Sequence, residues 1–213
     1  MAVANFTHTS KDQAEPISNH DGTNDNVALQ ELSAFLAGKI TSNVGSFAQV
    51  TYSEIDRSTT LDGVDLRYAQ PLKVGDTNMI LGFDFNNNPT MQDPYNTLGA
   101  WSFPYTSSDL VPGRNASPFL LGGIEHQAAG LSSYVYLNNS LYLEVGGYTS
   151  LSHGLLDTLG VADEAGKLSA IAPYGRLAFN QSWGRSSGSI GLVAMQASLH
   201  PERETGPTNK YSD

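Results

Sequence analysis

The stretch Gly130–Thr149 reads GLSSYVYLNNSLYLEVGGYT and decides the fold. Apolar residues recur at every second position on both sides of Asn138-Asn139, which is the spacing of β-strands whose side chains alternate between two faces. Two adjacent Asn residues tolerate the positive φ angles of a tight hairpin turn. The sequence therefore predicts a long antiparallel hairpin with one apolar face. The opposite face is polar, aromatic or small (Ser132, Tyr134, Tyr136, Tyr142, Glu144, Gly146 and Tyr148).

The same alternation recurs along the chain and predicts about nine strands. Several of them reach the roughly 9 to 11 residues that an oblique strand needs to cross a bilayer. Short turns and long connections roughly alternate between these strands, which is typical of outer-membrane barrels. The predicted strands cover residues 1–11, 28–40, 44–52, 61–72, 78–86, the two arms of the hairpin, 171–183 and 189–200, and one helical turn is predicted at 154–159.

We predict a single all-β domain over residues 1–213, an antiparallel up-and-down transmembrane β-barrel. Long loops are expected near 12–26, 87–127 and 150–168. Residues 209–213 resemble the start of a further strand, so we expect the chain to be an incomplete piece of a larger barrel. A soluble all-β domain is the alternative, because alternation in any one strand is a weak signal.

Composition and charge exclude several classes of function. The net charge is −10, from 21 acidic and 11 basic residues, and no Lys/Arg cluster exists, so nucleic acid is an unlikely partner. The chain has no Cys, which excludes disulfides, thiolate metal sites and a c-type haem attached within it. The first residues show no signal peptide, and no apolar stretch approaches the roughly 18 residues of a membrane helix.

Sequence motifs give little support to an enzyme. Gly184–Gly188 fits G-x-S-x-G, but this string joins two predicted strands, whereas a nucleophile elbow joins a strand to a helix. The five His residues lack ligand spacing. Asp21–Asn26 offers oxygen ligands for Ca²⁺ without the full loop pattern or a closing Glu. We therefore expect no catalytic residue, no metal ligand and no cofactor-binding residue in this chain.

Charged residues within the predicted strands are the better candidates for function. They lie opposite apolar neighbours, and an Arg that faces lipid at mid-depth costs ~2–4 kcal/mol, so a barrel would turn them inward. They are predicted to line a pore and to set its solute preference, or else to be paired charges on the wet face of a soluble sheet. The candidates are Glu31, Asp65, Arg67, Asp84, Glu144 and Arg176. Trp101, Phe103 and Tyr105, in the Pro-rich connection, are candidates for a constriction loop, or for a packed extracellular loop.

Five strings resemble a family of porin-like outer-membrane proteins of Gram-negative bacteria, often catalogued as cytochrome c proteins. They are DLRYA (65–69), the loop 86–108, GGYTSLS (146–152), GVADEAG (160–166) and APYGRLA (172–178). The resemblance covers nearly the whole chain and implies a barrel in the bacterial outer membrane. In that family a single C-x-x-C-H precedes the barrel. This chain has no Cys, so haem c is expected only on a segment outside it.

Three functions follow as hypotheses. The first is a porin-like barrel that lets small solutes or ions pass through a charged lumen, with the lipid bilayer as its surroundings. The second is a barrel that sheathes a haem-bearing segment or a redox protein partner in electron transfer across the outer membrane. The third is a soluble all-β binding module. Oligomers are common among porins, so an oligomer is compatible with the first hypothesis.

Overall fold

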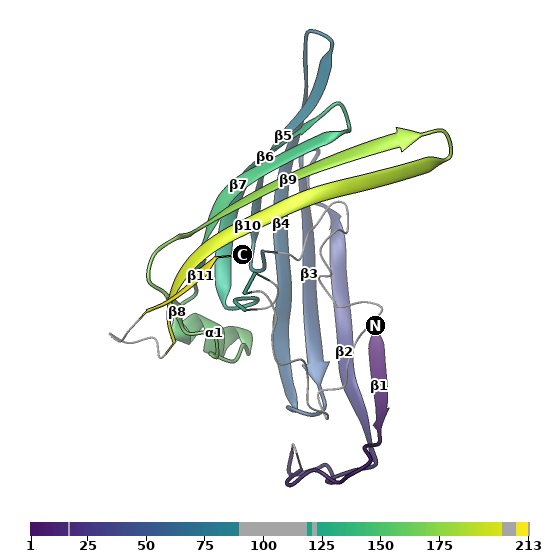
Figure 1. The fold of residues 1–213 in the computed structure, drawn as a ribbon, viewed down its shortest axis with the longest axis vertical. Coiled ribbons are helices and arrows are strands. Elements are labelled where there is room, and N and C mark those ends of the chain that lie inside the picture. The colour runs from purple at the N-terminus through teal and green to yellow at the C-terminus, as the bar shows by residue number, and fades with distance from the viewer. Residues whose placement is uncertain (17, 90–118, 121–122, 202–207, 213) are drawn as a thin grey trace.

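One antiparallel sheet of eleven strands makes up nearly all of the fold (Figure 1). The computed structural model describes residues 1–16, 18–89, 119–120, 123–201 and 208–212. The strands are β1 (Ala2–Thr7), β2 (Asn26–Lys39), β3 (Val44–Ser53), β4 (Ser58–Val74), β5 (Thr77–Asn86), β6 (Ala128–Leu137), β7 (Leu141–Ser150), β8 (Lys167–Leu168), β9 (Ala172–Trp183), β10 (Ser186–His200) and β11 (Asn209–Ser212). A short helix, α1 (His153–Leu159), lies between β7 and β8.

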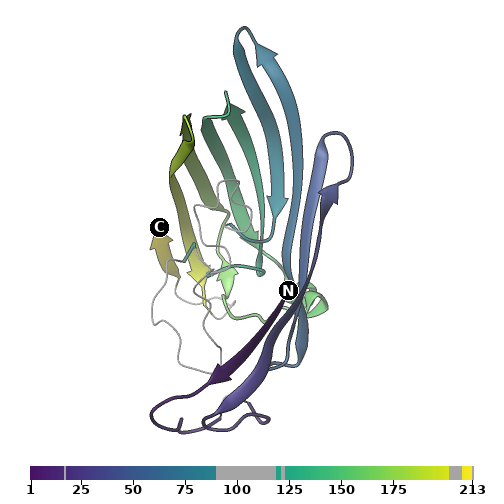
Figure 2. The same ribbon diagram turned by 90° about the vertical axis from the view of Figure 1, so that its right-hand side faces the viewer.

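Consecutive strands are neighbours in the sheet, in the order β1-β2-β3-β4-β5-β6-β7-β9-β10-β11, with β8 paired to β10. The prediction of an all-β, antiparallel, up-and-down fold is therefore confirmed. The sheet is twisted and curled, but it is not closed into a barrel (Figures 1 and 2). The short strand β11 lies where the sequence indicated the start of a further strand, at residues 209–213, whereas β8, which has only two residues, was not predicted.

Connections of different length lie at the two ends of the strands (Figure 1). At one end, here called the turn end, residues 40–43, 75–76, 138–140 and 184–185 connect the strands. At the other end, here called the long-connection end, the connections are residues 8–25, 54–57, 87–127, 151–171 and 201–208. Helix α1 is at the long-connection end and ends at Gly160, whose φ of 69° suits a residue without a side chain.

In the described part of the chain, no helix is long and apolar enough to cross a membrane.

The β6–β7 hairpin follows from its turn residues. Asn138 and Asn139 have φ angles of 47° and 54°, in the left-handed region that Asn tolerates better than most residues. The Asn138 N–H donates to the Asn78 carbonyl (2.8 Å), and the Asn78 N–H donates to Asn138 Oδ1 (2.9 Å). The turn therefore fixes the hairpin and also ties it to the start of β5.

The outer face of the sheet is apolar and exposed. Leu81, Val135, Leu143, Leu177 and Leu192 are register partners and form one row across β5, β6, β7, β9 and β10. Leu143 is 45% exposed and Leu192 is 70% exposed. Other large apolar side chains of this face are also exposed, among them Leu36, Val50, Leu66, Phe83, Phe85, Leu131, Val145, Phe179 and Ile190. The described part of the chain thus provides no second layer over the face that a soluble sheet would bury.

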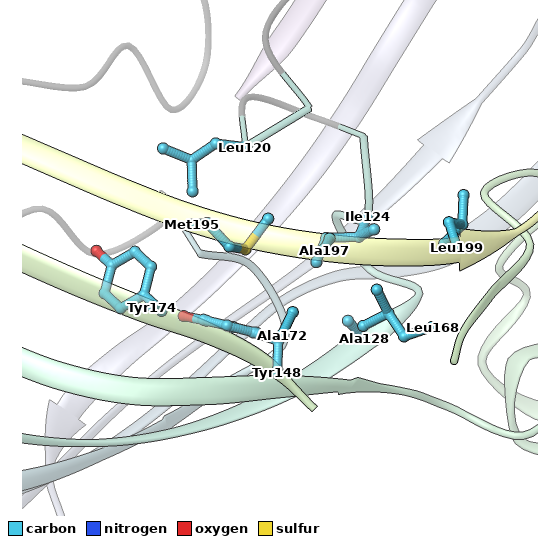
Figure 3. Close-up of a cluster of buried hydrophobic side chains, with 10 residues drawn as sticks. All are labelled: Leu120, Ile124, Ala128, Tyr148, Leu168, Ala172, Tyr174, Met195, Ala197 and Leu199. Atoms are coloured by element: carbon cyan, nitrogen blue, oxygen red, sulfur yellow. The ribbon is translucent and has the colours of Figure 1, made fainter. Parts of the chain in front are cut away.

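The inner face, which carries the alternate side chains, is buried toward the long-connection end and in the middle of the sheet, whereas it is exposed near the turn end of β2, β4 and β10. Toward the long-connection end it holds an apolar cluster in which Leu120 and Ile124, from the segment before β6, pack against the sheet (Figure 3). The sheet contributes Tyr148 and Tyr174, whose ring centroids are 5.6 Å apart, and Met195. The remaining members are Ala128, Leu168, Ala172, Ala197 and Leu199. Burial on this face stabilises the long-connection end of the sheet.

Candidate functional site

Charged and polar side chains gather on the inner face between the apolar cluster and the turn end. The register explains why they meet. Arg67 on β4 is paired with Asp84 on β5, and Asp84 is paired with Ser132 on β6. One step closer to the turn end, Glu144 on β7 is paired with Arg176 on β9. Because side chains alternate between the two faces of a sheet, residues two positions apart in one strand point to the same face and lie near the same neighbours on the adjacent strand.

Arg67 is the centre of the first group. Its Nη2 donates to Asp65 Oδ2 (3.0 Å) and to Asp84 Oδ2 (2.5 Å), so one guanidinium serves two carboxylates. Asp65 is 4% exposed and Asp84 is 2% exposed. The guanidinium carbon also lies 5.6 Å from the centre of the Tyr134 ring, within the range of a cation–π contact. Two buried acids therefore share a single cation in this group.

Glu144 is the centre of the second group. Ser132 Oγ donates to its Oε1 (2.5 Å) and Tyr142 Oη donates to its Oε2 (2.8 Å). Both of these donors are neutral. The Arg176 guanidinium carbon lies 5.8 Å from the centre of the Tyr142 ring, and Glu144 and Arg176 are each 5% exposed. The carboxylate is therefore held in place by hydroxyl groups, beside an Arg that stacks on a neighbouring ring.

Tyrosine hydroxyls extend the polar layer in both directions along the strands. Tyr134 Oη donates to the carbonyl of Tyr68 (3.0 Å). Tyr148 Oη donates to Asn86 Oδ1 (3.0 Å), which links the polar groups to the apolar cluster. The Tyr134 and Tyr142 ring centroids are 5.6 Å apart. The aromatic rings thus fill the space between the charged groups, while their hydroxyls satisfy polar atoms.

Two glycines make room for these rings. A Cβ on Gly82 would collide with the Tyr134 ring and the Tyr68 carbonyl, and a Cβ on Gly130 would collide with the Tyr148 ring. Each glycine is the register partner of the Tyr whose ring covers it. The glycines therefore permit an inner layer of large aromatic side chains directly on the sheet.

A separate set of polar contacts lies on β2, β3 and β4. Ser33 and Thr51 hydroxyls are 2.9 Å apart and buried. Gln49 Nε2 donates to Asp62 Oδ2 (3.1 Å) beside a bulge in the β3–β4 ladder. Glu31 also belongs to this side of the sheet, where it is half-buried and paired in register with Val3 on β1.

The structure therefore brings together five of the six charged residues proposed from the sequence. Asp65, Arg67 and Asp84 share one group, and Glu144 and Arg176 form the neighbouring group. Glu31 lies apart from both. Trp101, Phe103 and Tyr105, the candidates for a constriction loop, lie outside the described residues.

Sequence reasoning placed Ser132, Tyr142 and Tyr148 on the polar face without giving them a role. It also missed Asn86 as the partner of Tyr148. Ser132 and Tyr148 bind residues on other strands, and Tyr142 binds Glu144 two residues away in its own strand. The pairing register of the strands is needed to show which of these side chains meet. A count of residues from the Asn138-Asn139 turn pairs Glu144 with Tyr134 and would have shown Ser132 as a diagonal neighbour of Glu144 on the same face.

Features elsewhere in the described residues do not add a reactive group to this site. Gly184–Gly188 joins β9 to β10 as a hairpin turn, so Ser186 is not at a strand-to-helix elbow. His153 Nδ1 lies 3.0 Å from Asp163 Oδ2 in the connection that contains α1, and His8 Nδ1 lies 2.6 Å from Asp25 Oδ1. Among the residues that the structure describes, no three His, Asp or Glu side chains group as metal ligands.

Two open surface pockets in the described part of the chain lie away from this site. One, of about 310 Å³, is lined by loop residues that include His20 and Arg57, and the other, of about 270 Å³, is lined by residues around Pro173 and Gln196. Neither pocket is lined by the Arg67 or Glu144 groups. These two groups consequently provide fixed charges and hydrogen bonds within a packed layer of side chains.

Comparisons with protein-family models, with curated proteins and with solved structures find no match to this chain.

Proposed function

We propose that this sheet forms part of the wall of an outer-membrane β-barrel that lets small solutes or ions pass through a charged lumen. In this arrangement the apolar outer face contacts lipid and the inner face borders the lumen. The barrel works by size and charge, without a chemical step.

The inverted polarity of the two faces carries the proposal. Ionisable side chains such as Asp84 and Arg176 are buried on the inner face, whereas Leu131, Ile190 and their neighbours are exposed on the outer face. A soluble sheet does the opposite, since it covers its apolar face and leaves charged residues in water. An exposed apolar surface that extends over many strands is favourable only where something apolar covers it, and in a bilayer that is hydrocarbon.

The open edges of the sheet support a barrel larger than the described strands. In a bilayer every backbone N–H and C=O must be paired within the protein, because no water is present in the hydrocarbon region. Among the described strands, the residues of β10 from Ser186 to Met195 pair with β9 only, and β1 pairs with β2 only. Further strands would have to pair with both edges, and with them the wall would close.

The lumen is expected to be narrow beside the two charged groups. Their side chains are hydrogen-bonded to one another and buried, so they do not leave a wide polar channel at that level. Such a lumen suits small ions and solutes better than large ones. The resemblance to porin-like outer-membrane proteins of Gram-negative bacteria favours the same compartment, and because this chain has no Cys, a c-type haem would be carried by another segment or partner.

Conductance tests the proposal directly. The full chain, inserted into a planar lipid bilayer, should produce discrete current steps in KCl, and it should migrate differently on a gel before and after heating, as folded barrels do. The boiled protein is the control and should give no steps. A chain that is folded in water without detergent and never raises the bilayer conductance would refute the proposal.

A further inference from the structure

Charge is distributed unevenly along the strand direction. In the part of the chain that the structure describes, the long connections carry ten acidic residues: Asp12, Glu15, Asp21, Asp25, Glu54, Asp56, Glu125, Asp157, Asp163 and Glu164. The same connections carry three basic residues, namely Lys11, Arg57 and Lys167. At the turn end the balance is reversed, since Lys39, Lys73 and Arg185 face a single acid, Asp76.

The inner face between these two ends also carries more carboxylates than cations. Arg67 is shared by Asp65 and Asp84, so one guanidinium serves two buried carboxyl groups. Glu144 is held by two neutral hydroxyls. Arg176 is the register partner of Glu144. The two groups together hold three buried carboxyl groups (Asp65, Asp84 and Glu144) and two guanidinium groups (Arg67 and Arg176).

Asp84 adds an independent observation. Its second oxygen, Oδ1, is buried and accepts no hydrogen bond in the described part of the chain. A buried carboxylate oxygen without a donor is costly, and a cation that approaches it would lower that cost. The inner face therefore has an acceptor group whose chemistry suits a small cation.

We infer that the path along the inner face favours cations over anions and that cations enter it most readily from the long-connection end. This inference rests on the proposed function and deepens it by naming the class of solute. Clustered charge of one sign raises the local concentration of counter-ions at a mouth, and carboxylates along the path continue the preference. The opposite charge at the turn end makes the two entrances unequal.

Reversal potential measures the preference. With the full chain in a planar bilayer between concentrated and dilute KCl, the potential at zero current should have the sign of cation flow. Because the Debye length falls from ~10 Å at 0.1 M to ~3 Å at 1 M salt, the preference should weaken as both solutions are made more concentrated. Currents at equal voltages of opposite sign should differ, since the two mouths differ in charge.

Two matched triple variants test the source of the preference. Neutralising three exposed acids at the long-connection end (Glu15→Gln, Asp157→Asn and Glu164→Gln) should move the reversal potential toward zero. Neutralising three exposed bases at the turn end (Lys39→Gln, Lys73→Gln and Arg185→Gln) should move it the other way. Asp84→Asn keeps the shape of the side chain, removes one charge from the inner face, and should also reduce the cation preference.

The outcomes separate the inference from the function that it extends. No conductance from folded protein refutes the proposed function, and the inference falls with it. Conductance with a zero or anion-type reversal potential leaves the proposed function standing and overturns the inference. Opposite shifts in the two triple variants support it, and equal potentials in both variants and in the unchanged protein contradict it.

Discussion

At the scale of single residues, the inner face is organised by one cation that serves two acids. Arg67 reaches Asp65 and Asp84 through the same terminal nitrogen, and its ring contact is with Tyr134. Breaking a buried pair is much more damaging than its net contribution suggests, because the remaining charge is left buried without its partner. Arg67 is therefore expected to matter more for folding than any exposed charge of the chain.

Arg67→Met is expected to destabilise the folded protein by ~3–5 kcal/mol, because it leaves two buried carboxylates beside each other. Arg67→Lys should be intermediate, since Lys keeps the charge and loses the planar fork. Urea unfolding of the protein in lipid vesicles, followed by tryptophan fluorescence, measures the change. Arg185→Met in the exposed β9–β10 turn is the control and should stay within ~0.5 kcal/mol of the original protein. Equal unfolding midpoints for the Arg67→Met and Arg185→Met variants would contradict the assignment.

Gly82→Ala and Gly130→Ala test the aromatic layer. Each new methyl group would enter the space of a Tyr ring on the neighbouring strand. Overpacking of this kind costs ~1–3 kcal/mol. Gly38→Ala is the matched control, because nothing lies within 4 Å of its added Cβ. The unfolding free energy of all three variants should separate the first two from the third; a loss of stability in Gly38→Ala alone would show that the rings are not packed on the sheet as described.

At the scale of the elements, the strands explain what could be read from the sequence. The β6–β7 hairpin was predicted at its observed turn, because strict alternation and two Asn residues specify both strand and register. Other features of the strands depend on tertiary contacts and could not be predicted from the sequence. The bulges at Val3/Ala4 and Gln49/Val50 change the alternation within a ladder without a sequence signal of their own.

The strand β8 and the contacts of the site could not be predicted from the sequence either, because both depend on contacts between strands. β8 is too short to show a period, and it forms because β10 offers it an edge, as it also does to β11. The charged residues could be assigned to one face from alternation alone. Which of them meet, as Arg67 meets Asp84, depends on how far β4 and β5 are displaced along each other. That displacement is set by the turn at residues 75–76 and by packing on the sheet.

Leu143→Arg tests the environment of the outer face. Leu143 lies in β7 between Val135 and Leu177, in the middle of the apolar row. If this row faces hydrocarbon, an Arg there costs ~2–4 kcal/mol, and insertion into vesicles should fall accordingly. If the row faces water, an exposed Leu can be replaced at a cost of only ~0.5 kcal/mol. Asn139→Arg in the hairpin turn is the control and should insert normally in both cases.

At the scale of the whole molecule, the edges that are unpaired among the described strands place the strongest constraint on where the sheet can lie. Between Ser186 and Met195, β10 has β9 on one side, while β11 begins to pair only at Gln196. On the other margin, β1 covers β2 only as far as Leu32. An exposed edge strand is a template for another strand, and in hydrocarbon each unpaired backbone group costs several kcal/mol. An open sheet and a bilayer location are therefore incompatible unless further strands complete the wall.

Amide hydrogen exchange in lipid nanodiscs decides whether that completion occurs. If the wall is closed, the amides of Ser186–Met195 should exchange as slowly as those of β6, which has neighbours on both sides. Residues 54–57 at the β3–β4 connection provide the fast reference, because they lie outside the strands. Slow exchange in nanodiscs, combined with fast exchange of the same segment in detergent that dissociates any partner, would mean that a second chain supplies the strands. Fast exchange at alternate residues of the segment in nanodiscs would leave the edge open to water, and a membrane-spanning wall could not then be built from this sheet.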